Sequence, residues 1–348
     1  MKATKKKRRN AEISPEEAMK QLQKIFKKRG IKALEMARKE ILKEKIECKE
    51  AREALRYFMT EYWKDLARPT LLSLACEAIG GDPELTTPIA VPMILISGAI
   101  DIHDDIIDQS KVKNRHPTVY GKFEKDIALL VGDALLFEGL TLLHEAVEKG
   151  VPAEKITVII GIIRRTFFEL GDAEALELHF RGRRDITPEE YVHVVRKKAA
   201  DVEAHTRISA VLGGGSNGEI EALSEYGRLL GMLIILRDDL MDLIDLKEIS
   251  QRIKRESLPL PILYALQDPK IKPILNSVLS KEMITKKDAE RILELIHKAG
   301  GIRYLERFMQ ELANRAYLIL DKIGPNRKYL KLFIQSTTLP FVQMAEFH

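Results

Sequence analysis

The amino-acid sequence predicts an all-α protein built as one helical bundle. Apolar residues recur at intervals of three and four through most of the 348 residues, which is the period of a helix with a buried face. Segments that alternate apolar and polar residues, as half-buried strands do, are absent from the sequence. The hydrophobic content of 45% excludes a disordered chain, and no apolar run approaches the ~20 residues of a membrane-spanning helix.

Several helix ends follow from capping signals. Ser14 and Thr187 are each followed by proline and two glutamates, so a hydroxyl caps the first turn and a carboxylate follows three residues later. The glycines at 80–81 and 213–215 predict helix ends, because glycine adopts the left-handed conformation at little cost. Four segments are apolar on nearly all sides and are expected in the middle of the bundle: residues 91–100, 126–145, 156–170 and 223–236.

Charge and cysteine content exclude other classes of protein. The net charge of +5 comes from six lysines and arginines in the first ten residues, so the rest of the chain is close to neutral. A nucleic-acid surface needs basic residues across a folded face, so we expect no nucleic-acid partner. We expect residues 1–12 to be a disordered basic tail and residues 13–348 to form the helical domain. Two cysteines and the lack of an export leader predict a cytoplasmic protein with no transmembrane segment.

Two strongly apolar segments end in the same pattern of aspartates, at positions i, i+1 and i+4. The first cluster contains Asp104, Asp105 and Asp108, and the second contains Asp238, Asp239 and Asp242. On a helix these positions let three carboxylates approach one point, where they would repel one another without a cation. Carboxylate oxygens without cysteine or clustered histidine favour Mg²⁺, which commonly bridges carboxylates to a phosphate. The clusters therefore predict a metal-bound diphosphate at the mouth of an apolar cavity.

The paired clusters, in an all-helical chain, resemble those of the trans-isoprenyl diphosphate synthases, the polyprenyl synthetase family. The likeness covers roughly residues 45–345 and implies an isoprenoid synthase bundle with a central deep apolar cavity. It rests also on these stretches: Ala67-Arg68-Pro69, residues 80–84, Pro117-Thr118, residues 132–136, Tyr191 with Lys198, and Leu260-Pro261.

The resemblance implies an Mg²⁺-dependent prenyltransferase of isoprenoid biosynthesis. Two or three Mg²⁺ ions held by the aspartates would bind an allylic diphosphate, and isopentenyl diphosphate would attack the resulting cation to give a longer trans-prenyl diphosphate. The catalytic residues implied are Asp104, Asp105, Asp108, Asp238 and Lys198, and Asp239 and Asp242 would support the metal. Arg68, Lys113 and Lys198 would bind substrate. The family is usually dimeric, so we expect a homodimer or a heterodimer with another synthase.

The sequence departs from the family pattern mainly where isopentenyl diphosphate would bind. Asp65 stands at the usual lysine position beside Arg68, Ser97 replaces a histidine or glutamine, and Asn114 replaces an arginine next to Lys113. A diphosphate needs several cationic partners to leave water, so these losses should weaken its binding. Three nearby cations would partly compensate if they point into the site: Lys64, Lys111 and Arg115.

Three small or aliphatic residues stand where a bulky aromatic would stop chain growth. Ile96, Ala99 and Ile100 precede the first aspartate cluster, so the resemblance implies a product of C20 or longer. Two other functions fit the uneven losses. One is a catalytically weak partner subunit of a heteromeric synthase. The other is a terpene synthase-like enzyme that ionises an allylic diphosphate without isopentenyl diphosphate.

Overall fold

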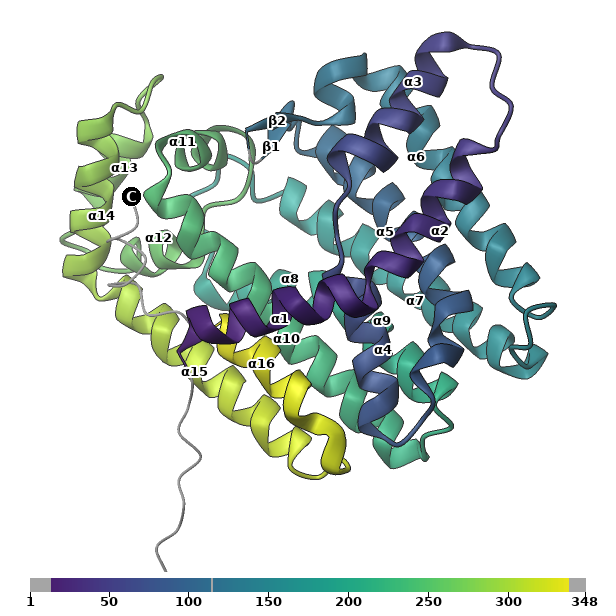
Figure 1. Cartoon of the computed structure of the whole chain (residues 1–348). Helices are drawn as coiled ribbons and strands as arrows, with labels where there is room; N and C mark the ends of the chain where they lie inside the picture. The colour runs from purple at the N-terminus through teal and green to yellow at the C-terminus, as the bar shows by residue number, and fades with distance from the viewer. Residues whose placement is uncertain (1–13, 114, 338–348) are drawn as a thin grey trace, which may run out of the picture.

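A computed structural model describes residues 14–113 and 115–337, which form an all-α bundle as the sequence predicts (Figure 1). Asn114 and the expected basic tail, residues 1–12, lie outside the described residues. The first half of the bundle consists of α1 (Pro15–Arg29), α2 (Ile31–Leu42), α3 (Lys49–Tyr57), the π-helical turn η1 (Phe58–Tyr62), α4 (Ala67–Ala78), the 3-10 turn η2 (Pro83–Thr86), α5 (Thr87–Ile107), α6 (Val119–Glu145) and α7 (Ala153–Leu178). The second half consists of α8 (Pro188–Lys198), α9 (Ala200–Leu212), α10 (Asn217–Ile244), α11 (Leu246–Arg255), α12 (Leu260–Ala265), α13 (Lys272–Leu279), α14 (Lys286–Ala299), α15 (Gly301–Leu320), the 3-10 turn η3 (Pro325–Arg327) and α16 (Lys328–Thr337).

The capping signals in the sequence mark real helix ends. The Ser14 hydroxyl accepts a hydrogen bond from the Glu17 amide at 3.2 Å and begins α1. Thr187 and Glu190 form a reciprocal capping box at the start of α8, with distances of 3.2 and 2.8 Å. Gly80 and Gly214, just beyond the ends of α4 and α9, have φ angles of +85° and +75°. Local sequence therefore determines these boundaries.

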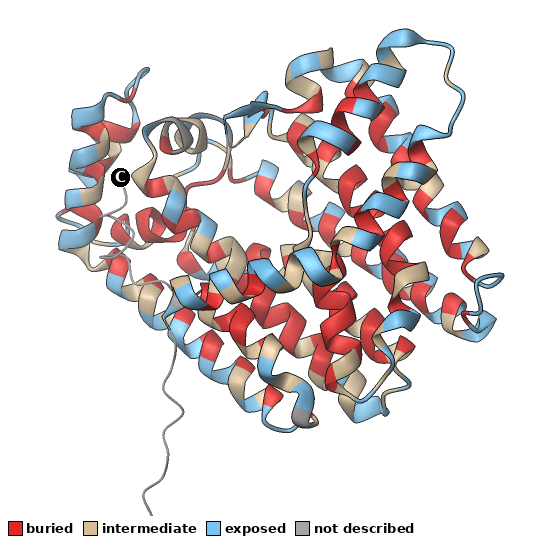
Figure 2. Ribbon diagram, viewed as in Figure 1, coloured by how far each residue is buried: buried red, intermediate tan, exposed pale blue. Residues whose placement is uncertain are grey.

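The core lies where α5 and α10 cross the middle of the bundle, and the buried residues gather there (Figure 2). Helix α5 packs against α6, and α10 packs against α9 and α15. Residues 91–99 of α5 and most of residues 223–233 of α10 are buried, which confirms the predicted central position of these two segments.

The predicted central position is wrong for segments 126–145 and 156–170. These segments belong to α6 and α7, and each helix buries one side only. Leu130 is 61% exposed, and Phe137 and Phe168 are each 75% exposed. Among the described residues, no element covers this apolar side.

Two helical stretches are long and apolar enough to cross a membrane, judged by length and composition only. The first, Pro83–Ile107, consists of η2 and α5, and the second, Val119–Glu145, is α6. Each has a mean hydropathy of 1.7 in its most apolar window. That window is 72% buried in the first helix and 39% buried in the second. Core helices of globular proteins pass the same test, so the finding is weak evidence for a membrane span.

A short hairpin follows α5. Strands β1 (Val112–Lys113) and β2 (His116–Pro117) pair antiparallel, with Lys113 opposite His116. The sequence analysis did not predict this hairpin, because two-residue strands leave no alternating pattern. Its effect is to bring Lys113 back over the end of α5, beside the first aspartate cluster.

Candidate active site

The first acidic cluster is completed by a residue that the sequence analysis missed. Asp104 and Asp108 lie one turn apart at the end of α5, and Glu174 of α7 faces them. One carboxylate oxygen from each of the three residues lies within 4.8 Å of the others. Carboxylate oxygens are the ligands that Mg²⁺ prefers, so this donor set fits a divalent ion. Glu174 lies four residues beyond the apolar segment 156–170, and no motif in the sequence marks it as a ligand.

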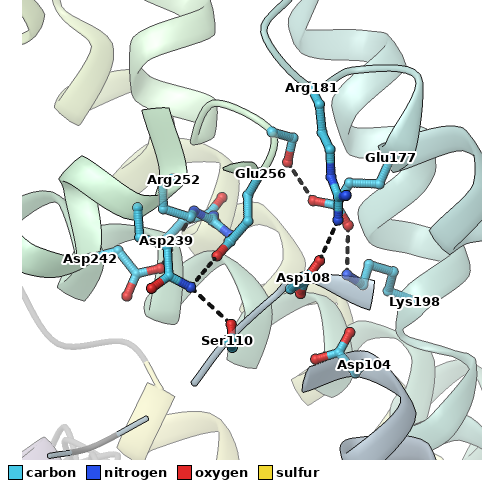
Figure 3. Close-up of polar contacts among 12 residues, drawn as sticks. Asp104, Asp108, Ser110, Glu177, Arg181, Lys198, Asp239, Asp242, Arg252 and Glu256 are labelled. Atoms are coloured by element: carbon cyan, nitrogen blue, oxygen red, sulfur yellow. Dashed lines mark hydrogen bonds and ion pairs between the residues drawn. The ribbon is translucent and has the colours of Figure 1, made fainter. Parts of the chain in front are cut away.

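Three cations contact the acidic residues here, and two of them, Lys198 and Arg181, are labelled in Figure 3. The Lys113 ammonium group lies 3.1 Å from Asp104 and 2.8 Å from Asp105. Lys198, at the end of α8, lies 3.0 Å from Glu174. The sequence analysis included Lys113 and Lys198 among the substrate-binding residues, and the structure places both beside the acidic groups.

The third cation, Arg181, was not predicted. It follows α7 and donates hydrogen bonds to the Asp108 carboxylate at 3.0 Å and to the Ile107 carbonyl at 2.9 Å. Arg181 therefore adds positive charge at Asp108, whereas Lys113 contacts Asp104 and Asp105. In Figure 3 the side chains of Arg181 and Lys198 lie beside Asp108 and Glu177.

Burial raises the pKa of several carboxyl groups at the end of α5. Asp105 is 1% exposed, and its burial raises its pKa to about 7, although Lys113 opposes the shift. Burial and the neighbouring Asp104 also raise the pKa of Asp108 to about 7. One turn earlier, burial raises the pKa of Asp101, which Lys113 and Arg68 lower and Asp104 and Asp65 raise further. A divalent cation here would therefore displace protons near neutral pH.

Glu177 behaves in the opposite way. Its burial alone would raise its pKa, but Lys198 at 2.6 Å and the Ser257 hydroxyl lower the pKa to about 2. The pKa of Lys198 is raised well above its usual value, because Glu177, Asp104 and Glu174 outweigh the effect of burial. Lys198 and Glu177 therefore form a permanently charged pair beside the first cluster.

The second cluster divides into an exposed and a buried part. Asp238 is 55% exposed and pairs with Arg237 at 2.8 Å. Asp239 is 1% exposed and accepts hydrogen bonds from the Tyr191 hydroxyl at 2.8 and 2.9 Å. The guanidinium group of Arg252, on α11, contacts Asp239 and lies 3.5 Å from Asp242. The sequence analysis did not identify Arg252, which neutralises part of this cluster.

Helix α11 connects the two clusters. The Gln251 side-chain amide donates to the Ser110 hydroxyl at 2.8 Å, just beyond the first cluster. Arg255 donates to the Gln109 carbonyl at 3.3 Å. In Figure 3 the group around Asp239 and Arg252 faces the group around Asp108, and Ser110 lies between them. The structure therefore brings the two predicted aspartate clusters to one site.

Arg68, the remaining predicted substrate-binding residue, is held by two carboxylates. Its guanidinium group lies 2.8 Å from Asp65 and 2.8 Å from Asp201 of α9. The three cations that could have compensated for the missing contacts, Lys64, Lys111 and Arg115, are exposed. Lys111 pairs with Glu124 at 3.0 Å, on the surface.

The predicted chain-length residues separate onto two faces of α5. Ile96 and Ile100 line a narrow cavity of about 10 Å³ between α5, α7 and α9, together with Ser97, Phe167 and Asp201. Ala99 packs instead with the cluster around α3 and α6. The aromatic Phe167 comes from α7, so inspection of the positions before the aspartates could not find it. A prenyl chain can enter here only if these side chains move apart.

Comparisons with a family model, with related sequences and with solved structures all point to the same family. A sequence model described as polyprenyl synthetase matches residues 48–296. The short chain isoprenyl diphosphate synthase of Methanothermobacter thermautotrophicus is 30% identical over 280 residues, which cover 80% of this chain and 78% of that protein. The geranylgeranyl diphosphate synthase of Methanosarcina mazei is 29% identical over 259 residues, or 73% of this chain and 78% of that protein. The crystal structure of geranylgeranyl pyrophosphate synthetase from Pyrococcus horikoshii Ot3 matches with a TM-score of 0.81 at 25% identity, covering 91% of this chain and 99% of that one.

The all-α bundle and these relatives define the protein as a prenyltransferase with a single helical domain. Within that class, the chain belongs to the polyprenyl synthetase family, whose model matches more than half of its length. The predicted family and fold class are confirmed.

Proposed function

We propose that the protein is an Mg²⁺-dependent prenyl diphosphate synthase, which condenses an allylic diphosphate with isopentenyl diphosphate. The cluster of Asp104, Asp108 and Glu174 at the end of an apolar helix is the observation that supports this most strongly. A metal-bound diphosphate requires such oxygen ligands, and an allylic cation requires the apolar, water-poor surroundings that α5 and α7 provide.

Each group of residues has a distinct task in this proposal. Asp104, Asp108 and Glu174, on α5 and α7, would hold Mg²⁺, and the aspartates of the second cluster, on α10, would supply further ligands. Bound Mg²⁺ supplies Lewis-acid stabilisation of the departing diphosphate. Lys113, Lys198 and Arg181 neutralise the charge that remains.

The reaction itself conserves atoms and charge. The allylic carbon–oxygen bond breaks, and the diphosphate leaves with the electron pair. The double bond of isopentenyl diphosphate then forms the new carbon–carbon bond, and loss of one proton gives a product five carbons longer. The apolar walls formed by Met93, Ile96 and Ile163 exclude water that would otherwise capture the cation.

We further propose a dimer. The apolar side of α6 and α7 includes Leu130 and Phe137, which are one heptad apart, together with Val158 and Phe168. A second copy of the chain packed against this side would remove these large side chains from water. Removing apolar surface from water is favourable, so the exposed apolar side favours association. The family resemblance implies the same assembly.

One assay separates the candidate functions. The purified protein is incubated with Mg²⁺ and C10, C15 or C20 allylic diphosphate, with and without isopentenyl diphosphate, and the products are identified by mass spectrometry. Elongation that needs both substrates supports the proposal. Consumption of the allylic diphosphate alone supports a terpene synthase-like enzyme, and this alternative is favoured by the carboxylates that surround Arg68. No turnover alone, but a changed product length when a conventional synthase is added, supports a partner subunit.

A further inference from the structure

The positive charge of Arg68 is already paired with carboxylates and is not free to bind an anion. The Arg68 Nη1 atom lies 2.8 Å from Asp65 Oδ2, and its Nε atom donates to Asp201 Oδ2 at 2.8 Å. One guanidinium group therefore faces two carboxylates, and the three residues together carry a net negative charge. An approaching diphosphate would meet this charge and would have to replace at least one charge-assisted hydrogen bond.

Asp65 is fixed in this position by local structure. Its Oδ1 atom accepts a hydrogen bond from the Ala67 amide at 2.7 Å, at the first turn of α4, while its Oδ2 atom contacts Arg68. The carboxylate thus caps the helix and binds the arginine with its two different oxygens. This double role keeps Arg68 bound to Asp65 rather than free to turn toward a ligand.

The Asp65–Arg68–Asp201 group also borders the candidate active site. Asp201 lines the narrow cavity together with Ile96 and Ile100, and Ile100 lies about one turn of α5 before Asp104. Asp65 and Arg68 both act electrostatically on Asp101, one turn before Asp104. Charge at this point therefore acts on the end of α5, where the first aspartate cluster lies.

We propose that Asp65 is a specificity-determining residue, which weakens the binding of isopentenyl diphosphate by holding Arg68 between two carboxylates. This inference rests on the proposed function and on the family resemblance, which implies that Arg68 binds substrate next to the position that Asp65 occupies. Asp65 acts through Arg68, so it is a positioning residue.

The test uses a variant that changes charge without changing shape. Asp65→Asn keeps a side-chain oxygen to cap the Ala67 amide and removes the negative charge. Calorimetric titration with isopentenyl diphosphate is expected to show at least about tenfold tighter binding to Asp65→Asn than to the wild-type protein, equivalent to about 1.4 kcal/mol. The KM for isopentenyl diphosphate should fall by a similar factor, whereas the KM for the allylic diphosphate should not.

Two further variants make the test specific. The double variant Asp65→Asn/Arg68→Gln should lose the gain, because the gain passes through Arg68. Asp82→Asn is the matched control, since Asp82 also caps a helical turn, through the Glu84 amide at 3.0 Å, but has no arginine partner in the described structure. It should bind like the wild-type protein.

Three results would overturn the inference: unchanged or undetectable binding in Asp65→Asn, an equal gain in the double variant, or an equal gain in Asp82→Asn. Because calorimetry measures binding without turnover, failure of the proposed function has a different signature. Tighter binding by Asp65→Asn without any elongation product would support the inference and contradict the proposed condensation.

Discussion

At the scale of single residues, the carboxyl groups of the first cluster hold protons that a metal ion must displace. Burial raises the pKa of both Asp105 and Asp108 to about 7, from a usual value of 3.8. The folded protein therefore binds more protons than the unfolded chain between these pH values. The free energy of unfolding contributed by these two groups consequently falls as the pH rises from about 4 to 7.

The same shifts predict a pH-dependent metal affinity. Mg²⁺ binds the ionised carboxylate only, so its affinity should rise between pH 6 and pH 8, by up to about tenfold per pH unit below 7 for each proton released. Calorimetric titration with Mg²⁺ in buffers of different ionisation enthalpy measures both the affinity and the protons released. An affinity that stays constant over this range, with no proton release, would contradict the assigned site.

Sequence alone identified the residues whose neighbours are close in the chain. Asp104 and Asp108 share a helix face by their spacing, and Lys113 follows only a few residues later. Glu174, Arg181 and Arg252 escaped detection, because packing of α7 and α11 brings them to the site from distant parts of the sequence. The contact between Arg68 and Asp201 is of the same kind, since it joins α4 to α9.

At the scale of elements, helix α7 forms one wall of the narrow cavity near the end of α5. Phe167 projects from α7 into the narrow cavity that Ile96 and Ile100 of α5 also line. The predicted product of C20 or longer assumed a floor without aromatic residues. We therefore expect Phe167 to limit chain growth.

Removing this side chain tests its effect. Phe167→Ala should shift the product distribution toward longer chains by at least one five-carbon unit, because a cavity replaces the aromatic ring. Products formed from C15 allylic diphosphate and isopentenyl diphosphate are separated by chromatography and compared with those of the wild type. Phe308→Ala, on α15, removes the same side chain elsewhere and should leave product length unaltered. Identical products from the wild type and Phe167→Ala would show that Phe167 does not form the floor.

The elements themselves were largely predictable, because capping and periodicity are local. The uncovered apolar side of α6 and α7 was not, since an apolar segment looks the same whether its own chain or another subunit covers it. Hairpin β1–β2 was missed for its shortness. Both features depend on contacts between distant parts of the chain or between subunits, which a local sequence pattern does not record.

At the scale of the whole molecule, the exposed apolar side predicts a dimer. Phe137→Asp places a charge at a position that is 75% exposed in one chain but would be buried between two copies. Light scattering after size exclusion should give a dimer mass for the wild type and a monomer mass for Phe137→Asp, with unchanged helical circular dichroism.

A matched variant controls for the added charge. Leu318→Asp introduces it at another exposed apolar position, 64% exposed on α15, and should remain dimeric. A monomeric wild-type protein, or dissociation of both variants, would show that α6 and α7 do not form the interface.

The proposed function requires that the carboxylates at the end of α5 enable transfer of a prenyl group to isopentenyl diphosphate. The most direct measurement is incorporation of labelled isopentenyl diphosphate into a longer prenyl diphosphate, with saturating Mg²⁺. Asp104→Ala and Asp238→Ala should each lower the rate by about 100-fold or more, because each loses a proposed metal ligand. Asp172→Ala, which removes a surface carboxylate that pairs with Lys197, should retain wild-type activity. Near-normal incorporation by Asp104→Ala, or none by the wild type, would contradict the account.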